Sequence, residues 1–280
     1  MPRLGGVGGG VGIGTIVIAM LVAWLFGINP LTFLGMLEGG GPVVEQSQPS
    51  RSGPGQPGPD ASSGAQPDAE RDFVSVVLAS TEDVWSGLFQ KSGNRYPPPT
   101  LVLFRGSTPT ACGQGSAASG PFYCPADQKL YIDLAFYRTL RDRLGAPGDT
   151  AQAYVIAHEV GHHIQNLTGT MSKMAEVRQQ AGERQYNELS VRVELQADCY
   201  AGIWAHHSQQ ARTWFEQGDI EEALNAAAAV GDDNIQRRTQ GTVVPESFTH
   251  GSSAQRARWF RTGLQSGAIS QCDTFAAKNP

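Results

Sequence analysis

Half of the chain's six histidines lie within the seven-residue segment AHEVGHH, together with one glutamate. His158, Glu159 and His162 form the pattern HExxH. On a helix, residues four apart project from one face one turn apart, so both imidazoles can bind one tetrahedral Zn²⁺. Glu159 is rotated by about 100° from His158 and need not be a ligand. We therefore expect it to act as a general base that accepts a proton from a zinc-activated water.

A catalytic zinc ion needs a third protein ligand. The compact pattern HExxHxxGxxH does not supply it, because Gln165 and Thr168 occupy the glycine and last histidine positions. The later segment ELQAD places Glu194 and Asp198 four residues apart, on one helix face. We expect Glu194 to be the third ligand, with Glu188 as the alternative. Asp198 is expected to accept the N–H of a ligand histidine and fix its tautomer.

The remaining histidines allow further roles. His163 lies about 140° from His158 around the helix and is expected to pack or hydrogen-bond at the rim, not to bind the metal. His250 precedes a helix whose expected cap is Ser252 or Ser253. It is a candidate donor to the oxyanion of a tetrahedral intermediate; capping or core hydrogen bonding is its alternative role. The rival donors are Tyr131, Tyr154 and Tyr200.

The elements that must position these residues are mostly helical. A capping box of Asp149 and Gln152 predicts the start of the HExxH helix. Apolar spacing predicts helices and short strands that together indicate an α+β fold. The segment KLYIDL is either an exposed edge strand that holds an extended peptide or an ordinary sheet member. The expected helices are 72–90, with a break near Ser80, 149–168 and 186–207; the expected strands are 100–106, 122–124 and 129–134.

The N-terminal part of the chain is different in composition. Residues 14–37 carry no charged side chain, which is long enough for a transmembrane helix. Arg3 precedes this span and two glutamates follow it, so the positive-inside rule places the N-terminus in the cytoplasm. We expect three regions: a cytoplasmic tip and membrane anchor (1–37), a disordered Pro/Gly/Ser-rich linker (38–70), and an extracytoplasmic domain (71–280) in the periplasm or at the cell exterior. The net charge of −5 and the lack of a basic run argue against a nucleic-acid partner.

The motifs together resemble one family. DVWSGLF, CPADQKLYIDLAFYRTL, HEVGHHIQNLTG, VELQADCYAGIWA and the His250 segment are similar to the bacterial neutral zinc metallopeptidases, which are membrane-anchored zincin-type proteins. The resemblance covers about residues 70–275. It implies a gluzincin-like site with one zinc per chain at His158, His162 and Glu194, and Glu159 as catalytic base. Within this layout we expect two disulfides, Cys112–Cys124 and Cys199–Cys272.

The predicted function is therefore a membrane-anchored zinc metallopeptidase that hydrolyses peptide or protein substrates, among them cell-envelope proteins. Two alternatives stay open. One is a non-catalytic zinc module that binds a partner in the envelope, although such a module has no need of the base Glu159. The other is a zinc amidase that cleaves peptidoglycan cross-links.

Overall fold

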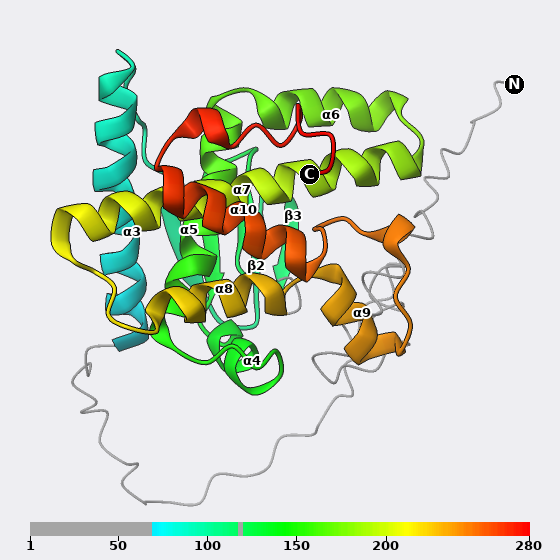
Figure 1. Cartoon of the computed structure of the whole chain (residues 1–280), viewed down its shortest axis with the longest axis horizontal. Coiled ribbons are helices and arrows are strands. Elements are labelled where there is room, and N and C mark those ends of the chain that lie inside the picture. Colours follow the sequence, from blue (N-terminus) through cyan, green and yellow to red (C-terminus); the bar gives the residue numbers. More distant parts are fainter. Residues whose placement is uncertain (1–68, 117–119) are drawn as a thin grey trace, which may run out of the picture. The chain divides into compact units, whose positions relative to one another are not determined.

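The computed structural model describes residues 69–116 and 120–280, and within them helices predominate (Figure 1). The helices are α3 (Ala69–Lys91), α4 (Phe136–Asp142), α5 (Asp149–Leu167), α6 (Thr170–Gln180), α7 (Glu183–Arg212), α8 (Asp219–Ala229), α9 (Asp232–Gln240) and α10 (Ser253–Ser266), with 3₁₀ turns η2 (Pro245–Ser247) and η3 (Ile269–Gln271). The strands are β1 (Thr100–Phe104), β2 (Ser107–Thr110), β3 (Gly113–Ser116), β4 (Phe122–Cys124) and β5 (Lys129–Asp133). This is the mostly helical α+β fold that the sequence predicts.

The larger sheet has the order β1-β5-β4, in which β5 is parallel to β1 and antiparallel to β4. Of the two alternatives for KLYIDL, the ordinary sheet member is therefore confirmed and the exposed edge strand is wrong, since β5 lies in the centre. Leu130 and Ile132 are buried on one face of β5 and Tyr131 on the other, which fits a central strand covered on both faces. The edges of this sheet are β1 and β4.

A second sheet forms in the segment between the strands expected at 100–106 and 122–124, where the sequence predicts no strand. Strands β2 and β3 pair in antiparallel register, from Ser107 opposite Ser116 to Thr110 opposite Gly113. These strands carry few β-branched or aromatic residues, so composition gives little sign of them.

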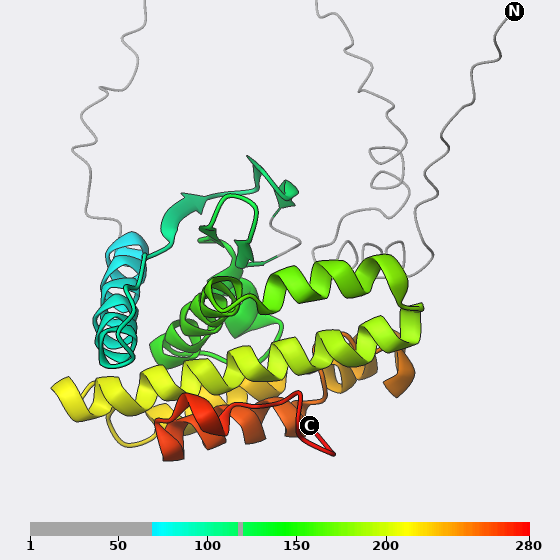
Figure 2. The ribbon, with the colours of Figure 1, turned by 90° about the horizontal axis from the view of Figure 1, so that it is seen from above.

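Helices α5, α7 and α10 form layers. Seen from above in Figure 2, the strands lie on one side of α5, and α7 with α10 lies on the other. Glycines allow α7 and α10 to approach closely. A Cβ on Gly202 would lie 2.1 Å from the carbonyl oxygen of Phe260, and a Cβ on Gly263 would lie 1.9 Å from that of Cys199. Neither position could hold a larger residue without separating the two helices.

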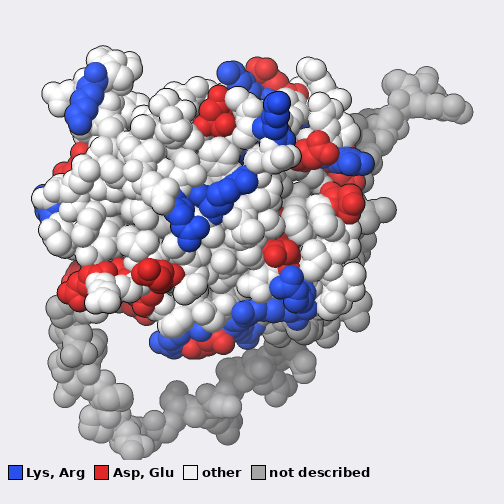
Figure 3. Space-filling view, in the orientation of Figure 1, with Lys and Arg blue, Asp and Glu red and all other residues white. Residues whose placement is uncertain are grey.

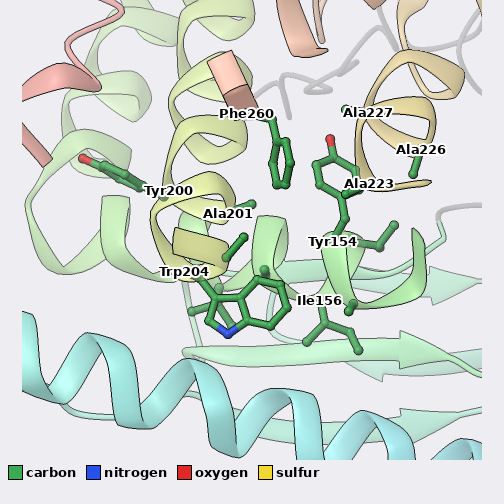
Figure 4. Close-up of a cluster of buried hydrophobic side chains, with 14 of the residues drawn as sticks. Tyr154, Ile156, Tyr200, Ala201, Trp204, Ala223, Ala226, Ala227 and Phe260 are labelled. Carbon is green, nitrogen blue, oxygen red and sulfur yellow. The ribbon is translucent and has the colours of Figure 1, made fainter. Parts of the chain in front are cut away.

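Apolar and aromatic side chains fill the space between these helices (Figure 4). Tyr154 of α5 meets Phe260 of α10 edge to face, with ring centroids 5.5 Å apart. Trp204 of α7 is buried in the same core and donates its indole N–H to Ser80 of α3. This core fixes α5 and α7 relative to each other, and the HExxH and ELQAD segments lie on these two helices.

Two expected helix features differ from the structure. Helix α3 runs unbroken through Ser80, because the Ser80 hydroxyl finds a partner in the buried Ser208 hydroxyl, 3.1 Å away. The capping box at Asp149 is wrong. The N-cap of α5 is Gly148, whose φ of 113° favours glycine, and Gln152 donates instead to the Gly148 carbonyl.

Both expected disulfides are present, Cys112–Cys124 and Cys199–Cys272. The first joins the β2–β3 turn to β4, and the second joins α7 to the segment after η3. Disulfides persist in oxidising compartments, so they indicate an extracytoplasmic domain.

The expected anchor at residues 14–37 and the linker from residue 38 lie outside the described residues. The structure describes the last two residues assigned to the linker, and they already belong to α3, which begins at Ala69. Among the described helices, none is long and apolar enough to cross a membrane.

Candidate metal centre

The two motif-bearing helices pack against each other at the HExxH segment. A Cβ on Gly161 would lie 2.9 Å from the carbonyl oxygen of Ala197, so glycine is needed for this close approach. Gly161 precedes His162, and Ala197 precedes Asp198. The glycine inside the motif thus brings the two sets of polar side chains together.

Glu194 of α7 reaches both motif histidines. One of its carboxylate oxygens lies 3.2 Å from Nε2 of His158, and the other lies 3.5 Å from Nε2 of His162. Two ligand atoms on one tetrahedral zinc ion, each about 2.0–2.1 Å from the metal, are about 3.3 Å apart. The two distances from Glu194 are therefore close to the spacing of ligands on a shared zinc ion.

The hydrogen bonds of His158 explain why a cation fits this position. Its Nδ1 lies 2.8 Å from the carboxylate of Asp198, which can only accept a hydrogen bond when ionised. A proton on Nδ1 leaves the Nε2 lone pair of the neutral ring facing the Glu194 carboxylate. Two acceptors this close repel each other unless a positive charge lies between them.

The pKa of His158 points to the same electrostatic preference. Burial lowers this pKa, but the carboxylates of Asp198 and Glu194 raise it, and the balance is a pKa of about 9. The surroundings therefore stabilise positive charge at this imidazole. A divalent cation satisfies that preference with both rings neutral.

His162 is oriented by Gln165, one turn later on α5. The Gln165 amide nitrogen donates to the carbonyl of Val193 (2.7 Å) and to the side-chain oxygen of Gln196 (3.1 Å). Its Oε1 must then accept from Nδ1 of His162 at 2.8 Å, which leaves Nε2 of His162 free to bind a metal. The residue that breaks the compact HExxHxxGxxH pattern thus positions the ring of His162.

The Glu159 carboxylate lies close to the rings of His158 and His162, which the Glu194 carboxylate also reaches. Ligand atoms of His158, Glu159 and His162 all lie within 4.8 Å of one another, and Glu159 is only 8% exposed. Burial raises the pKa of its carboxyl group, which the two histidines and a hydrogen bond from the Tyr123 backbone N–H oppose. The result is a carboxylate with increased proton affinity, held next to the metal position.

Asp198 connects His158 to Tyr154 and Arg256, two residues for which the sequence did not predict this contact. The fully buried carboxylate accepts hydrogen bonds from Tyr154 Oη at 2.5 Å and from Nε and Nη2 of Arg256, both at 2.9 Å. Burial raises the pKa of Asp198, but Arg256 and His158 lower this pKa by a larger amount, so the net shift is downward. Asp198 is thus held as an anion that four donors surround.

Arg256 had a recognisable signal in the sequence. The buried residues of α10 follow the helical period: Arg256, Trp259, Phe260 and Gly263. A charge on the apolar face of a helix requires a buried partner. The partner's identity depended on the packing of α10 against α7.

His250 lies near the centre but at its surface. Its Nδ1 is 3.1 Å from the Asp232 carboxylate. The positive charge of a protonated His250 also lowers the pKa of Glu194. Asp232 also accepts the backbone N–H groups of Thr249, His250 and Gly251, at 2.7–3.0 Å. No protein group in the described residues bonds to Nε2 of His250, which leaves it available to a bound molecule. Asp232, which holds this loop, was missed because no motif marks it.

His163 is not part of the metal group. It is fully buried between α5 and β4, not at the rim as expected. Its Nε2 donates to the Pro97 carbonyl at 2.7 Å, and its Nδ1 accepts from the Tyr123 hydroxyl at 2.9 Å. His163 therefore ties α5 to β4, whose Tyr123 N–H reaches Glu159.

The other candidates lie elsewhere. Glu188, the alternative ligand, is exposed and paired with Arg184 at 3.2 Å. The hydroxyls of two rival tyrosines are engaged, Tyr131 with Asp127 and Tyr154 with Asp198. Tyr200, the third rival, is buried against Trp85.

Residues 2–275 match the family described as "Putative neutral zinc metallopeptidase". The chain belongs to this family. The match extends to residue 2, beyond the resemblance over residues 70–275, and so includes the apolar N-terminal stretch.

Relatives occur in distant bacteria. The chain is 48% identical to "Uncharacterized protein YpfJ" of Escherichia coli K12 over 278 residues, which cover 98% of this chain and 91% of the relative. It is 43% identical to "Uncharacterized protein Rv2575" of Mycobacterium tuberculosis over 223 residues, which cover 75% of this chain and 73% of the relative. No solved structure matches the chain.

Proposed function

We propose that this protein is a zinc-dependent metallopeptidase with a zincin-type domain. The proposal rests on one observation above all: two carboxylates reach the motif histidines, since buried Glu159 lies within 4.8 Å of the ligand atoms of both and Glu194 lies 3.2 and 3.5 Å from their Nε2 atoms. Glu194 then serves as the third ligand, and Glu159 is free to act as a base. A purely structural zinc site has no use for such a base. The family and the HExxH group support the same function.

The residues that would hold the zinc ion are His158, His162 and Glu194. Zinc bound by three protein ligands lowers the pKa of a bound water to about 7 and polarises a carbonyl group. Asp198 and Gln165 keep both imidazoles in the tautomer that leaves Nε2 free. These two residues therefore act through the ligands, as second partners of the rings.

Glu159 accepts the proton of the attacking water on a carboxylate oxygen and then passes it to the leaving amine. Burial suits this role, since a raised pKa brings the carboxyl group closer to neutral pH. The Tyr123 backbone N–H holds the carboxylate in place. Nε2 of His250 is the candidate donor to the oxygen of the attacked carbonyl, because Asp232 already engages Nδ1.

Strand β4 is the candidate strand for holding the substrate. It pairs only with β5 in the described sheet, and the N–H of Tyr123 points to Glu159. The open edge of β4 therefore borders the metal centre, where an extended peptide could add by backbone pairing. Strand β5, for which the sequence left this role open as one of two alternatives, is internal.

The proposal includes a membrane anchor at residues 1–37 with the N-terminus in the cytoplasm, a linker over 38–70 and an extracytoplasmic catalytic domain from residue 71. The uncharged span and the disulfides support this layout. Peptides or proteins of the cell envelope are then the substrates within reach. No nucleic-acid partner is part of the proposal.

The test is Glu159→Gln in the zinc-loaded chain. Glutamine has nearly the same shape but cannot accept the proton, so hydrolysis of a peptide mixture should fall by at least about 100-fold. Zinc content, measured by atomic absorption, should stay at one per chain, because Glu159 is not a ligand in this arrangement.

The matched control is Glu176→Gln, which changes an exposed glutamate on α6 and should leave hydrolysis unchanged. Full activity of Glu159→Gln would overturn the mechanism. Comparison of envelope proteomes from cells with the native chain and with Glu159→Gln would then identify substrates, and release of muropeptides from purified cell wall would indicate an amidase instead.

A further inference from the structure

A groove of about 630 Å³ lies between the first half of α7 and the segment around η2. Its α7 wall includes Asn187 and Val191, and its opposite wall includes Pro245 and Phe248. Its volume is within the range of about 300–1,000 Å³ that is usual for ligand pockets. The metal-centre residues do not line this groove.

The groove adjoins the metal centre on both walls. On α7, Asn187 and Val191 precede Glu194 by seven and three residues, so they share its helix face. On the other wall, Phe248 and Ser252 flank His250 on either side in the sequence. The inner end of the groove is thus bounded by neighbours of a metal ligand and of the candidate oxyanion donor.

We propose that this groove binds the part of an extended peptide substrate on one side of the cleaved bond, with an apolar side chain against Phe248. The inference rests on the proposed peptidase function and names the substrate chemistry that the site selects. Between Arg184 and Val191 the helix rises about 10 Å, which is the length of about three residues of extended chain. The groove therefore holds a short peptide segment.

The lining suits a peptide backbone. The Asn187 side-chain amide has no hydrogen-bond partner among the described residues, so it can bond to a peptide group. One edge already binds backbone carbonyls: Arg192 donates to those of Thr274, Phe275 and Ala277 in the turn near the C-terminus. Gln255 likewise donates to the carbonyl of Pro280 at 2.8 Å.

The charges in the groove favour an uncharged peptide. Two arginines and two glutamates line it: Arg184, Arg192, Glu188 and Glu246. Charges of both signs are also interspersed on the molecular surface around α6 and the start of α7, at the upper right of Figure 3. With balanced charges, the groove should select by shape and apolar contact, and binding should change little with salt.

The first measurement is binding without turnover. A photo-crosslinking phenylalanine analogue replaces Asn187 in the zinc-loaded Glu159→Gln chain, and a proteome-derived peptide mixture is the probe. Position 185 on the same helix is the control, because Gln185 is exposed and lies outside the groove. We expect crosslinked peptides at position 187 and none above background at 185. Equal crosslinking at both positions would overturn the inference.

The second measurement is kinetic. Phe248→Ala should raise KM for peptides with a large apolar residue beside the cleaved bond by about tenfold, with kcat nearly unchanged. The control is Val244→Ala, which truncates an exposed apolar residue next to η2 and outside the groove. Asn187→Trp, which fills the groove from the helix surface, should raise KM even if Phe248→Ala folds poorly.

The two proposals fail in different ways. If Glu159→Gln abolishes hydrolysis but both groove variants keep the native KM, the groove inference is wrong and the peptidase function stands. If the native chain hydrolyses no peptide but position 187 still crosslinks, the peptidase function is wrong and the groove is a peptide-binding site.

Discussion

Replacing Asp198 by asparagine tests how the metal centre is supported. The substitution keeps the shape of the side chain but removes its charge. Four donor groups surround the native carboxylate: Nδ1 of His158, the hydroxyl of Tyr154, and Nε and Nη2 of Arg256. The asparagine amide has one acceptor oxygen for these donors, and its NH₂ group, itself a donor, faces the donors that the second carboxylate oxygen served.

The expected loss of stability follows from the burial of the pair. Arg256 is 4% exposed and Asp198 is fully buried, so the arginine would lose the anionic partner of its two hydrogen bonds and keep its own charge in the interior. Glu194, at 3.9 Å, compensates only in part. Removing one partner of a buried ion pair costs about 3–5 kcal/mol. We expect Asp198→Asn to lower the free energy of unfolding by that amount.

Zinc affinity should fall as well. Loss of the carboxylate that orients a ligand histidine lowers metal affinity by about 10–100-fold. The double variant Asp198→Asn, Arg256→Met separates the two effects. It removes the unpaired charge, so stability should recover, while zinc affinity should stay low because His158 still lacks its anionic partner.

Urea unfolding of the metal-free chain measures stability, and competition with a chelator of known affinity measures zinc binding. Metal-free protein is needed for the first assay because bound zinc itself stabilises the native state. An Asp198→Asn variant within about 1 kcal/mol of the native stability would contradict the assigned ion pair. Recovery of zinc affinity in the double variant would contradict the role of the charge in orienting His158.

Two further predictions concern the histidines outside the metal group. His250→Ala should lower turnover and leave zinc content unchanged; unchanged turnover would discard its role as a donor. Burial lowers the pKa of His250, but Asp232 and Glu194 raise it, with a net upward shift. The donor form is therefore present below this raised pKa, and turnover that depends on it should fall as the pH rises through it. Asp232→Asn should move that fall to lower pH in a pH–rate profile. His163→Phe should keep zinc bound but lower the free energy of unfolding by about 1–3 kcal/mol, since the Pro97 carbonyl and the Tyr123 hydroxyl lose their partner. Loss of zinc in this variant would place His163 in the metal group.

Local sequence patterns were enough to predict the part of the site that lies on one helix. The period of an α-helix brings the side chains of His158 and His162 to one face, and the same period places Glu159 beside them. Short-range spacing also predicted the long helices and the strands of the larger sheet. These features depend on residues within a few positions of one another, so no long-range contact was needed to infer them.

Tertiary structure decided how the helices and strands meet. The distance from Glu194 to the histidines depends on the packing of α5 against α7 at Gly161, which no local pattern specifies. The partners of Asp198 come from α5 and α10, and the loop of His250 is held by Asp232 of α9.

The position of β5 in the sheet likewise depends on contacts between distant segments. Its composition predicts a strand, but only its pairing with both β1 and β4 makes it internal and leaves β4 at the open edge beside Glu159. Helix period is a local property of the chain, whereas strand order and buried ion pairs depend on which distant segments share the core.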